Sequence, residues 1–302
     1  MTSSFMHSTM GRRRFLAVSA AVVLGGATRS TLAETSDWSG IALGAEVKIT
    51  LAGSQPGDAL RTFSKVEAVL RGVEEQFSLY RESALTRLNR IGRLPHPTSA
   101  MLDLFQLAGD VHAVSGGLFD PTIQPLWLAI AKSGDVRGAL EFVGWERVLV
   151  SKDEIVLEPG MQLTFNGMAQ GYAADRVATL LASEGYRDVL IDTGEITALG
   201  LRPDGQKWRA DIVLPDGRKV ARTEISDMAL AVSSPKGTLI GQGVPHIVNP
   251  RGQFAPVWEL IAVSAPSAAL ADGLSTAFCM MDRKAIDQAL AVLPGAHLAA
   301  II

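Results

Sequence analysis

Cysteine is almost absent from this sequence. The 302 residues contain one, Cys279, within the apolar stretch 276–280. A single cysteine excludes an intrachain disulfide even in an oxidising compartment, so the fold must be held by packing. Residues 31–34 contain no cysteine, and nothing there could carry a lipoprotein anchor.

Two nucleotide-binding signatures are missing as well. No glycine-rich loop ends in Gly-Lys-Ser/Thr, which excludes a Walker loop, and no G-x-G-x-x-G opens a Rossmann unit. An excess of positive charge is also lacking. The formal net charge is −3, and it becomes −7 without residues 1–33, which carry four arginines and no acid. Such an acidic body argues against nucleic acid as a partner.

The N-terminus has the layout of an export signal. Arg-Arg-Arg-Phe-Leu at residues 12–16 opens an otherwise uncharged run, rich in Ala, Val, Leu and Gly, that lasts to Thr28. Paired arginines before Phe-Leu are typical of a twin-arginine signal peptide, and the run is too short for a stable membrane anchor. Small residues at Thr31 and Ala33 predict cleavage before Glu34. We expect a signal peptide at 1–33, a domain at 34–302 and a soluble periplasmic product.

Hydrophobic spacing predicts interspersed helices and strands. Apolar residues recur every three or four positions over residues 58–77, and a second helix is expected from Ser99 as its N-cap. Further helices are predicted at 170–183, 268–281 and 285–293, and strands at 41–51, 147–150, 155–157, 189–191, 196–199, 208–213, 228–232 and 260–264. No regular strand-helix-strand rhythm appears, which favours an α+β domain, compact or two-lobed, with mixed or antiparallel sheets flanked by helices.

Two segments in the first half combine aromatic, glycine and polar residues. Tyr80 ends the first predicted helix beside a polar loop, where a ring can stack on a flat heterocycle or simply pack. In the second segment, Gly116 and Gly117 precede Phe-Asp-Pro-Thr at 119–122. Such a turn allows close approach to a ligand. The alternative is a helix end followed by a capping aspartate.

Two segments in the second half could meet a phosphate. Residues 163–175 pass from a short strand through a glycine turn into a helix, whose free N–H groups suit an anion. An ordinary strand-to-helix turn is the alternative. His246 precedes Asn-Pro-Arg-Gly at 249–252, a composition typical of a loop at the rim of a site. A structural hydrogen-bonding histidine is the alternative.

The fifth segment pairs Asp272 with Thr276. At i and i+4 on a helix, their side chains lie on one face about one turn apart. Two hard oxygens so placed can hold Mg²⁺, which takes its remaining ligands from water and substrate phosphate. The alternative is an aspartate favoured by the helix dipole together with a back-bonded threonine.

In this order the segments resemble the ApbE family of FAD:protein FMN transferases over essentially all of residues 34–302. The family motifs are Met-Gly-Thr, Phe-Ser-x-Tyr, Gly-x-Phe-Asp-Pro-Thr, Gly-Gly-Ile-Ala-Lys-Gly-Tyr, Gly-Gly-Asp/Glu-Ile, His-Ile-x-Asp-Pro-x-x-Gly and Ala-Asp-x-x-Ser/Ala-Thr-Ala. The matching segments are, in the same order, 43–45, 77–80, 117–122, 166–172, 193–196, 246–252 and 271–277.

The resemblance implies a site, a reaction and partners. Mg²⁺ would be held by the Gly167 carbonyl and by the side chains of Asp272 and Thr276. The residues lining the FAD site would be Leu43, Tyr80, Leu118, Phe119, Asp120, Thr164, Gln170 and His246. In the family reaction, a Thr or Ser hydroxyl of an acceptor flavoprotein attacks the FMN phosphorus of FAD and AMP leaves. Asp272 is the expected base, with His246 assisting in proton movement or phosphate binding.

Several positions depart from the family pattern. Gln170 stands where Lys is common and Thr164 where Asp is common, while Leu43 and Asn249 also replace the usual residues. With the twin-arginine signal, this variant looks like the NosX-type accessory proteins of nitrous oxide reduction. That subgroup implies a membrane-bound acceptor with a periplasmic flavin domain, such as a nitrous oxide reductase regulator. The alternatives are an FAD pyrophosphatase yielding FMN and AMP, and a non-catalytic flavin-binding assembly factor, which the missing Lys favours.

Overall fold

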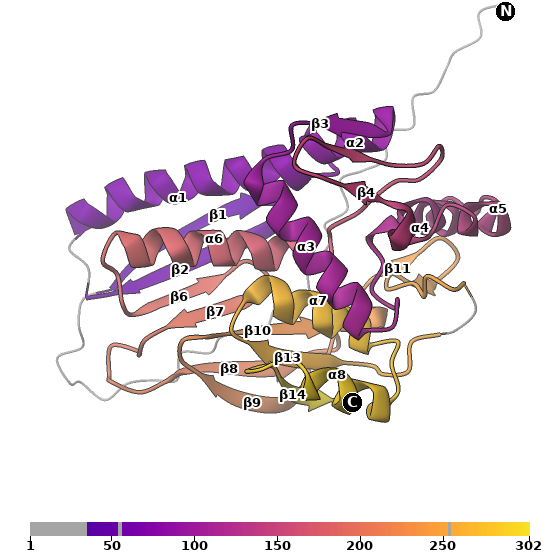
Figure 1. Ribbon diagram of the computed structural model, residues 1–302. Helices are drawn as coiled ribbons and strands as arrows, with labels where there is room; N and C mark the ends of the chain where they lie inside the picture. The colour runs from indigo at the N-terminus through magenta and orange to yellow at the C-terminus, as the bar shows by residue number, and fades with distance from the viewer. Residues whose placement is uncertain (1–34, 54–55, 253–254) are drawn as a thin grey trace, which may run out of the picture.

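A seven-stranded antiparallel sheet forms the centre of the molecule (Figure 1). The computed structural model describes residues 35–53, 56–252 and 255–302, so the predicted signal peptide and its boundary lie outside the described residues. The strands, in spatial order, are β1 (Thr35–Ala42), β2 (Ala45–Ala52), β6 (Val189–Asp192), β7 (Ile196–Leu199), β10 (Met228–Ser233), β13 (Ile261–Ala265) and β14 (His297–Ile301).

Helices cover one face of this sheet and a hairpin covers the other (Figure 1). The helical layer contains α1 (Pro56–Phe77), α6 (Ala169–Ser183) and α7 (Ala268–Phe278), and α3 (Ser99–Val114) packs on α7. The hairpin is β8 (Trp208–Val213) and β9 (Lys219–Ile225). Side chains alternate across the strands, so Ala229 and Ala231 join the core under the helices while Leu230 joins the core under the hairpin.

Smaller elements surround the helical layer. α2 (Ala84–Ile91) is capped by the Ser83 hydroxyl, and a second sheet has the order β3 (Arg93–Pro95), β5 (Glu154–Val156), β4 (Leu149–Val150). The other elements are α4 (Gln124–Ala131), α5 (Val136–Leu140), α8 (Arg283–Ala291), the hairpin β11 (Leu239–Ile240) and β12 (Val244–Pro245), and the 3-10 turns Pro121–Ile123, Trp145–Arg147 and Pro235–Gly237. None of the helices in the described parts of the chain has the length and apolar character needed to span a bilayer.

The predicted α+β class with antiparallel sheets and flanking helices is confirmed, but several details were wrong. The helix expected over residues 268–281 ends at Phe278, and the strand expected over residues 147–150 is shortened to Leu149–Val150 by the 3-10 turn before it. The single strand expected over residues 41–51 is a hairpin, because Leu43 and Gly44 take left-handed conformations with φ of 51° and 83° and reverse the chain in two residues. The N-cap of α3 is Thr98 and not Ser99, since the Thr98 hydroxyl accepts the Met101 N–H.

Candidate functional site

The hairpin turn between β1 and β2 lies against Tyr80. A Cβ built on Gly44 would be 3.6 Å from Cε2 of the Tyr80 ring, and the backbone N–H of Leu43 donates to Glu74 Oε1 at 3.0 Å. The Tyr80 hydroxyl shares a hydrogen bond with the Asn166 side chain, while 57% of the residue stays exposed. The ring is therefore fixed at one end and open to a flat partner at the other.

The turn before α6 lies against the last turn of α7. A Cβ on Gly167 would be 3.2 Å from Thr276 Oγ1 and 3.3 Å from Cε2 of Phe119, which is tighter than most real contacts. The backbone at Gly167 therefore lies directly beside the Thr276 hydroxyl. The backbone φ of Gly167 is not left-handed, so it is the close approach to Thr276 and Phe119 that favours glycine at this position.

Asp272 is a buried carboxylate with little hydrogen-bonding support. Its Oδ2 accepts the Gly171 N–H at 3.4 Å, a long bond, and burial together with the nearby Asp175 carboxylate raises its pKa to about 7. Asp175, in contrast, accepts hydrogen bonds from Ser267 Oγ and from the N–H groups of Ala268 and Ala269 at the start of α7. Asp272 therefore has fewer hydrogen-bond donors than Asp175 to stabilise its negative charge, and a bound cation would supply that stabilisation.

Hydroxyl groups complete this cluster. Ser233 Oγ lies 2.8 Å from Ser275 Oγ and 3.4 Å from Thr276 Oγ1, and Ser275 Oγ donates to the Asp272 carbonyl at 3.0 Å. Carboxylate, hydroxyl and carbonyl oxygens are the ligands that Mg²⁺ prefers. Within the described residues, no three His, Cys, Asp or Glu side chains group as a metal site. A cation here would therefore depend on Thr276 and the Gly167 backbone as well as on Asp272.

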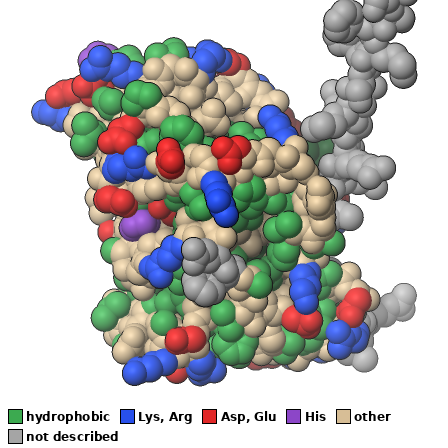
Figure 2. Space-filling view, turned by 90° about the vertical axis from the view of Figure 1, so that its right-hand side faces the viewer, with side chains coloured by type: hydrophobic (Ala, Val, Ile, Leu, Met, Phe, Trp, Pro, Cys, Tyr) green, Lys and Arg blue, Asp and Glu red, His purple; other side chains and the backbone are tan. Residues whose placement is uncertain are grey.

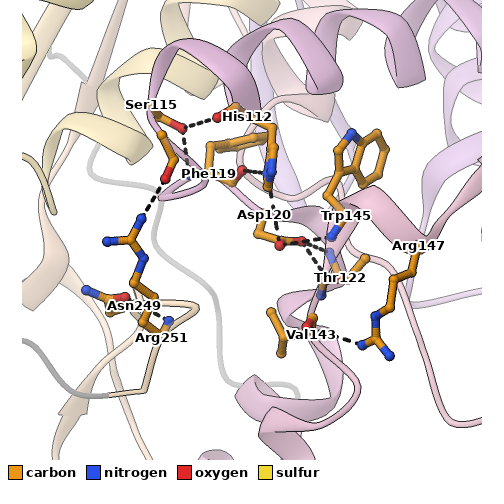
Figure 3. Close-up of polar contacts among 12 residues, drawn as sticks. His112, Ser115, Phe119, Asp120, Thr122, Val143, Trp145, Arg147, Asn249 and Arg251 are labelled. Carbon is orange, nitrogen blue, oxygen red and sulfur yellow. Dashed lines mark hydrogen bonds and ion pairs between the residues drawn. The ribbon is translucent and has the colours of Figure 1, made fainter.

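Asp120 supports its own turn (Figure 3). Its Oδ1 accepts from the backbone N–H and the hydroxyl of Thr122, at 2.8 and 2.5 Å, and its Oδ2 accepts the Trp145 N–H at 3.2 Å. His112 Nδ1 lies 4.0 Å from the same oxygen and 2.8 Å from the Phe119 carbonyl. The capping aspartate considered as an alternative is thus present, and both carboxylate oxygens are engaged within the protein.

His246 is held in one tautomer. Its Nδ1 lies 3.0 Å from the Pro235 carbonyl and 3.2 Å from the Thr238 carbonyl. Because carbonyl oxygens only accept, Nδ1 carries the proton and Nε2 is left as the basic atom. Burial lowers the pKa of His246, which keeps the ring neutral near pH 7. Trp127 Nε1 donates to the His246 carbonyl at 3.0 Å and fixes the backbone.

An arginine joins the His246 loop to the glycine turn after α3 (Figure 3). Arg251 donates from Nη2 to the Gly116 carbonyl at 2.7 Å, and its own N–H is accepted by Asn249 Oδ1 at 2.8 Å. Half-buried Leu118 follows this turn, its N–H 3.4 Å from the Ser115 carbonyl. Segments 115–119 and 246–252 are therefore neighbours, as a shared site requires.

The remaining predicted residues lie around the start of α6. The Thr164 N–H donates to the Pro121 carbonyl at 2.8 Å, and the Thr164 hydroxyl accepts the Asn166 N–H at 3.2 Å. The carbonyl of Gln170 accepts from Thr193 Oγ1 at 3.2 Å, while the Gln170 residue is half-buried. Both residues thus border the helix N-terminus that was predicted to meet a phosphate.

Taken together, the contacts connect most of the predicted site. Gly44, Tyr80 and Asn166 lead to Gly167, which touches Phe119 and Thr276. His246 connects more remotely, through Pro235, two residues after Ser233. Sequence reasoning missed the roles of Asn166 and Ser233, although each stands inside a segment that it singled out. The signal that could have identified them is that each is a polar residue directly after an apolar residue in its segment.

Acidic and basic side chains are mixed on the face shown in Figure 2. Lys and Arg alternate with Asp and Glu, and hydrophobic side chains show between them. No patch of one sign forms among the described residues on this face. Steering of a strongly charged polymer to this side is therefore not favoured.

Comparisons with known proteins point in one direction. The sequence profile of the ApbE family matches residues 43–302. The FAD:protein FMN transferases of Salmonella typhimurium and Klebsiella pneumoniae are 27% and 26% identical to this chain over 274 residues, covering 80% of it and 77% of each relative. The solved flavin transferase ApbE of Vibrio cholerae superposes with a TM-score of 0.76 at 24% identity, over 89% of this chain and 98% of that one. The apo flavinyl transferase ApbE of Pseudomonas stutzeri gives 0.75 at 25% identity, over 87% and 90%.

Proposed function

The chain belongs to the ApbE family, and from this premise we propose that it is a Mg²⁺-dependent FAD:protein FMN transferase. It would attach FMN through a phosphoester to a Thr or Ser of an acceptor flavoprotein and release AMP. One observation carries the proposal: buried Asp272, Thr276 and the Gly167 backbone converge where α6 begins, next to the exposed ring of Tyr80.

The arrangement suits a flavin dinucleotide. Tyr80 offers a ring face for the isoalloxazine or adenine system, with Leu43 beside it in the β1–β2 turn. The N-terminus of α6 favours phosphate through its dipole. The pyrophosphate would then lie between the ring site and the Asp272 carboxylate.

The residues present fit a divalent cation. Asp272 supplies a negative charge, and the hydrogen bond described to its carboxylate comes from a backbone N–H and not from a basic side chain. Thr276 and Gly167 add neutral oxygens. Magnesium bound there would neutralise charge that develops on the pyrophosphate oxygens. Asp272, Thr276 and Gly167 would hold it, and substrate and water would complete its ligands.

Two groups can accept the proton of the attacking hydroxyl. The Asp272 carboxylate is the first, and His246 Nε2 is the second. The hydroxyl oxygen forms a bond to the FMN phosphorus as the bond from that phosphorus to the bridging oxygen breaks. AMP departs with that oxygen, and the proton passes from the base to solvent or AMP.

A coupled assay tests this proposal. The protein is incubated with FAD, Mg²⁺ and a purified flavin-domain acceptor, and AMP release is compared with the fluorescence and mass of the denatured acceptor. Transfer gives equal amounts of AMP and FMN-modified acceptor. AMP without acceptor modification would instead identify a pyrophosphatase, and bound FAD without AMP would identify a flavin-binding assembly factor. Asp272→Ala should abolish turnover, and unaltered flavinylation in that variant would contradict the metal site.

We further propose that the protein acts in the periplasm after twin-arginine export, with a NosX-type role in nitrous oxide reduction. The support is the Arg-Arg-x-Phe-Leu run at residues 12–16 and the variant motif 165–172, in which Gln170 replaces Lys. The acceptor would be a membrane-bound nitrous oxide reductase regulator. The double substitution Arg12→Lys and Arg13→Lys should leave the precursor in the cytoplasm. Mass spectrometry of exported flavoproteins, with and without this protein, should locate the FMN adduct.

A further inference from the structure

Glu195 is a buried acid without a full set of partners. It stands just before β7, is 7% exposed, and its Oε2 atom has no hydrogen-bond partner. Burying a carboxylate oxygen without a donor is costly, so such an atom requires an explanation. None of the residues expected to bind FAD or Mg²⁺ is Glu195, and the transfer step described above does not use it.

The strand pattern places Glu195 beneath α6 and α7. Its neighbours Ile196 and Ala198 pack in the core under the β8–β9 hairpin. Because side chains alternate along a strand, Glu195 and Thr197 face the opposite side, where α6 and α7 lie. On the adjacent strand β10, Ser233 faces the same side and contacts Thr276.

The charges that act on Glu195 are themselves acidic. Asp272 and Asp192 both repel its carboxylate, and the backbone N–H of Val232 donates to it. The turn carrying Glu195 is tied to the start of α6, because the Thr193 N–H donates to the Glu195 carbonyl at 3.0 Å and Thr193 Oγ1 donates to the Gln170 carbonyl at 3.2 Å. The repulsion between Glu195 and Asp272 is thus built into a rigid part of the fold.

We infer that Glu195 is a positioning residue for the divalent cation held by Asp272: its free carboxylate oxygen accepts a hydrogen bond from a water bound to that cation. This inference rests on the proposed metal-dependent function. Mg²⁺ keeps several of its waters in protein sites, and such waters need acceptors beyond the direct ligands. A second carboxylate also raises the negative charge that the cation meets. Outer carboxylates of this kind orient metal ligands and contribute to affinity.

A purely structural role predicts something different. If Glu195 only filled space, a neutral residue of the same shape would change metal-free stability without altering cation affinity. Thr197 provides a matched control, since it faces the same side of the sheet two residues away and its buried Oγ1 also lacks a partner. Thr197→Val removes that polar atom at constant shape and without a change of charge.

The test is titration of the purified full chain with Mn²⁺, followed by electron paramagnetic resonance, and melting with and without Mg²⁺, for wild type, Glu195→Gln, Thr197→Val and Asp272→Asn. We expect Glu195→Gln to weaken Mn²⁺ binding by about 10–100-fold. Because it removes a buried charge that Asp272 repels, the same variant should melt no lower than wild type without metal, and it should show a smaller rise with Mg²⁺. Thr197→Val should bind Mn²⁺ as wild type does.

The outcomes separate the two proposals. If wild type binds Mn²⁺ through Asp272 but Glu195→Gln binds equally well, or only loses metal-free stability, the role assigned to Glu195 is overturned while the transferase function stands. If wild type shows no Asp272-dependent Mn²⁺ binding, the metal site itself is wrong and the inference fails with it. Partial recovery of affinity in Glu195→Asp would support the need for a carboxylate.

Discussion

The backbone N–H of Gly171 in α6 donates to Oδ2 of Asp272 in α7 at 3.4 Å. The contact exists because the two helices approach backbone to backbone. A Cβ placed on Gly171 would lie 2.3 Å from the Ala268 carbonyl oxygen, a distance that real Cβ atoms do not show. The close packing of α6 on α7 therefore determines where the Asp272 carboxylate meets the helix that is expected to bind phosphate.

Gly171→Ala tests this relationship. The added methyl group must push α6 away from α7, and overpacking of this kind costs about 1–3 kcal/mol of unfolding free energy. Separation of the helices also displaces Asp272, so Mn²⁺ and FAD binding should weaken. Urea unfolding and Mn²⁺ titration measure the two effects.

Gly72→Ala is the matched control, because Gly72 lies within α1 and a Cβ there meets nothing within 4 Å. Alanine is the better helix former, so this variant should gain up to about 1 kcal/mol. Equal effects from the two substitutions would mean that the close approach at Gly171 is unimportant.

Much of this arrangement could be predicted from the sequence, because the main helices and the central strands carry clear periodic patterns. Asp272 and Thr276 were paired by helical spacing alone. The contact of Gly167 with Thr276 could not be predicted in the same way, since it joins segments more than 100 residues apart. Glu195 was found in a matching motif, but nothing in its neighbours along the chain shows that it is buried next to another acid. Such facts depend on tertiary packing.

Asp272→Asn should change how metal-free stability depends on pH. The folded-state pKa of Asp272 is about 7, against 3.8 for an unperturbed aspartate. Between these values the unfolded chain ionises while the folded chain keeps the proton, so stability falls as pH rises from 4 to 7. The loss is at most about 4 kcal/mol. Urea unfolding at pH 5 and 7.5 in chelator should show a flatter dependence for Asp272→Asn, and identical slopes would count against the shift.

His246→Asn separates position from basicity. The asparagine amide can still donate near the Pro235 carbonyl, but it has no counterpart of Nε2. If Nε2 accepts the proton, turnover should fall by about 10²–10⁴-fold. Because burial lowers the pKa of His246, protonation of the ring should contribute a decline of the wild-type rate on the acid side of neutrality, and His246→Asn should lack this contribution. His297→Asn, at an exposed position of β14, is the control, and normal turnover in His246→Asn would remove histidine from the proton pathway.

Gln170→Lys should strengthen FAD binding. The substitution restores a positive charge at the start of α6, where the pyrophosphate is expected, and a partly exposed ion pair contributes up to about 1 kcal/mol. The KM for FAD should fall by up to about fivefold and become more sensitive to salt. Gln206→Lys, in the exposed turn before β8, adds the same charge elsewhere. An equal change in KM from both variants would show that net charge, and not position, is responsible.

Tyr80 gives the most direct test of where the flavin nucleotide lies. Tyr80→Ala removes the ring beside the β1–β2 turn, and loss of a stacking contact costs about 1–2 kcal/mol, so the Kd for FAD should rise roughly 5–30-fold. Tyr80→Phe keeps the ring and loses the hydrogen bond to Asn166, so it should remain within about threefold of wild type. Quenching of FAD fluorescence on binding measures both constants. Tyr186→Phe is the control, because the Tyr186 hydroxyl contacts Thr62 near the start of α1 whereas Tyr80 follows the end of that helix. If Tyr80→Phe were as damaging as Tyr80→Ala, the hydroxyl and its link to Asn166 would be the important feature, and the ring would not be the stacking surface.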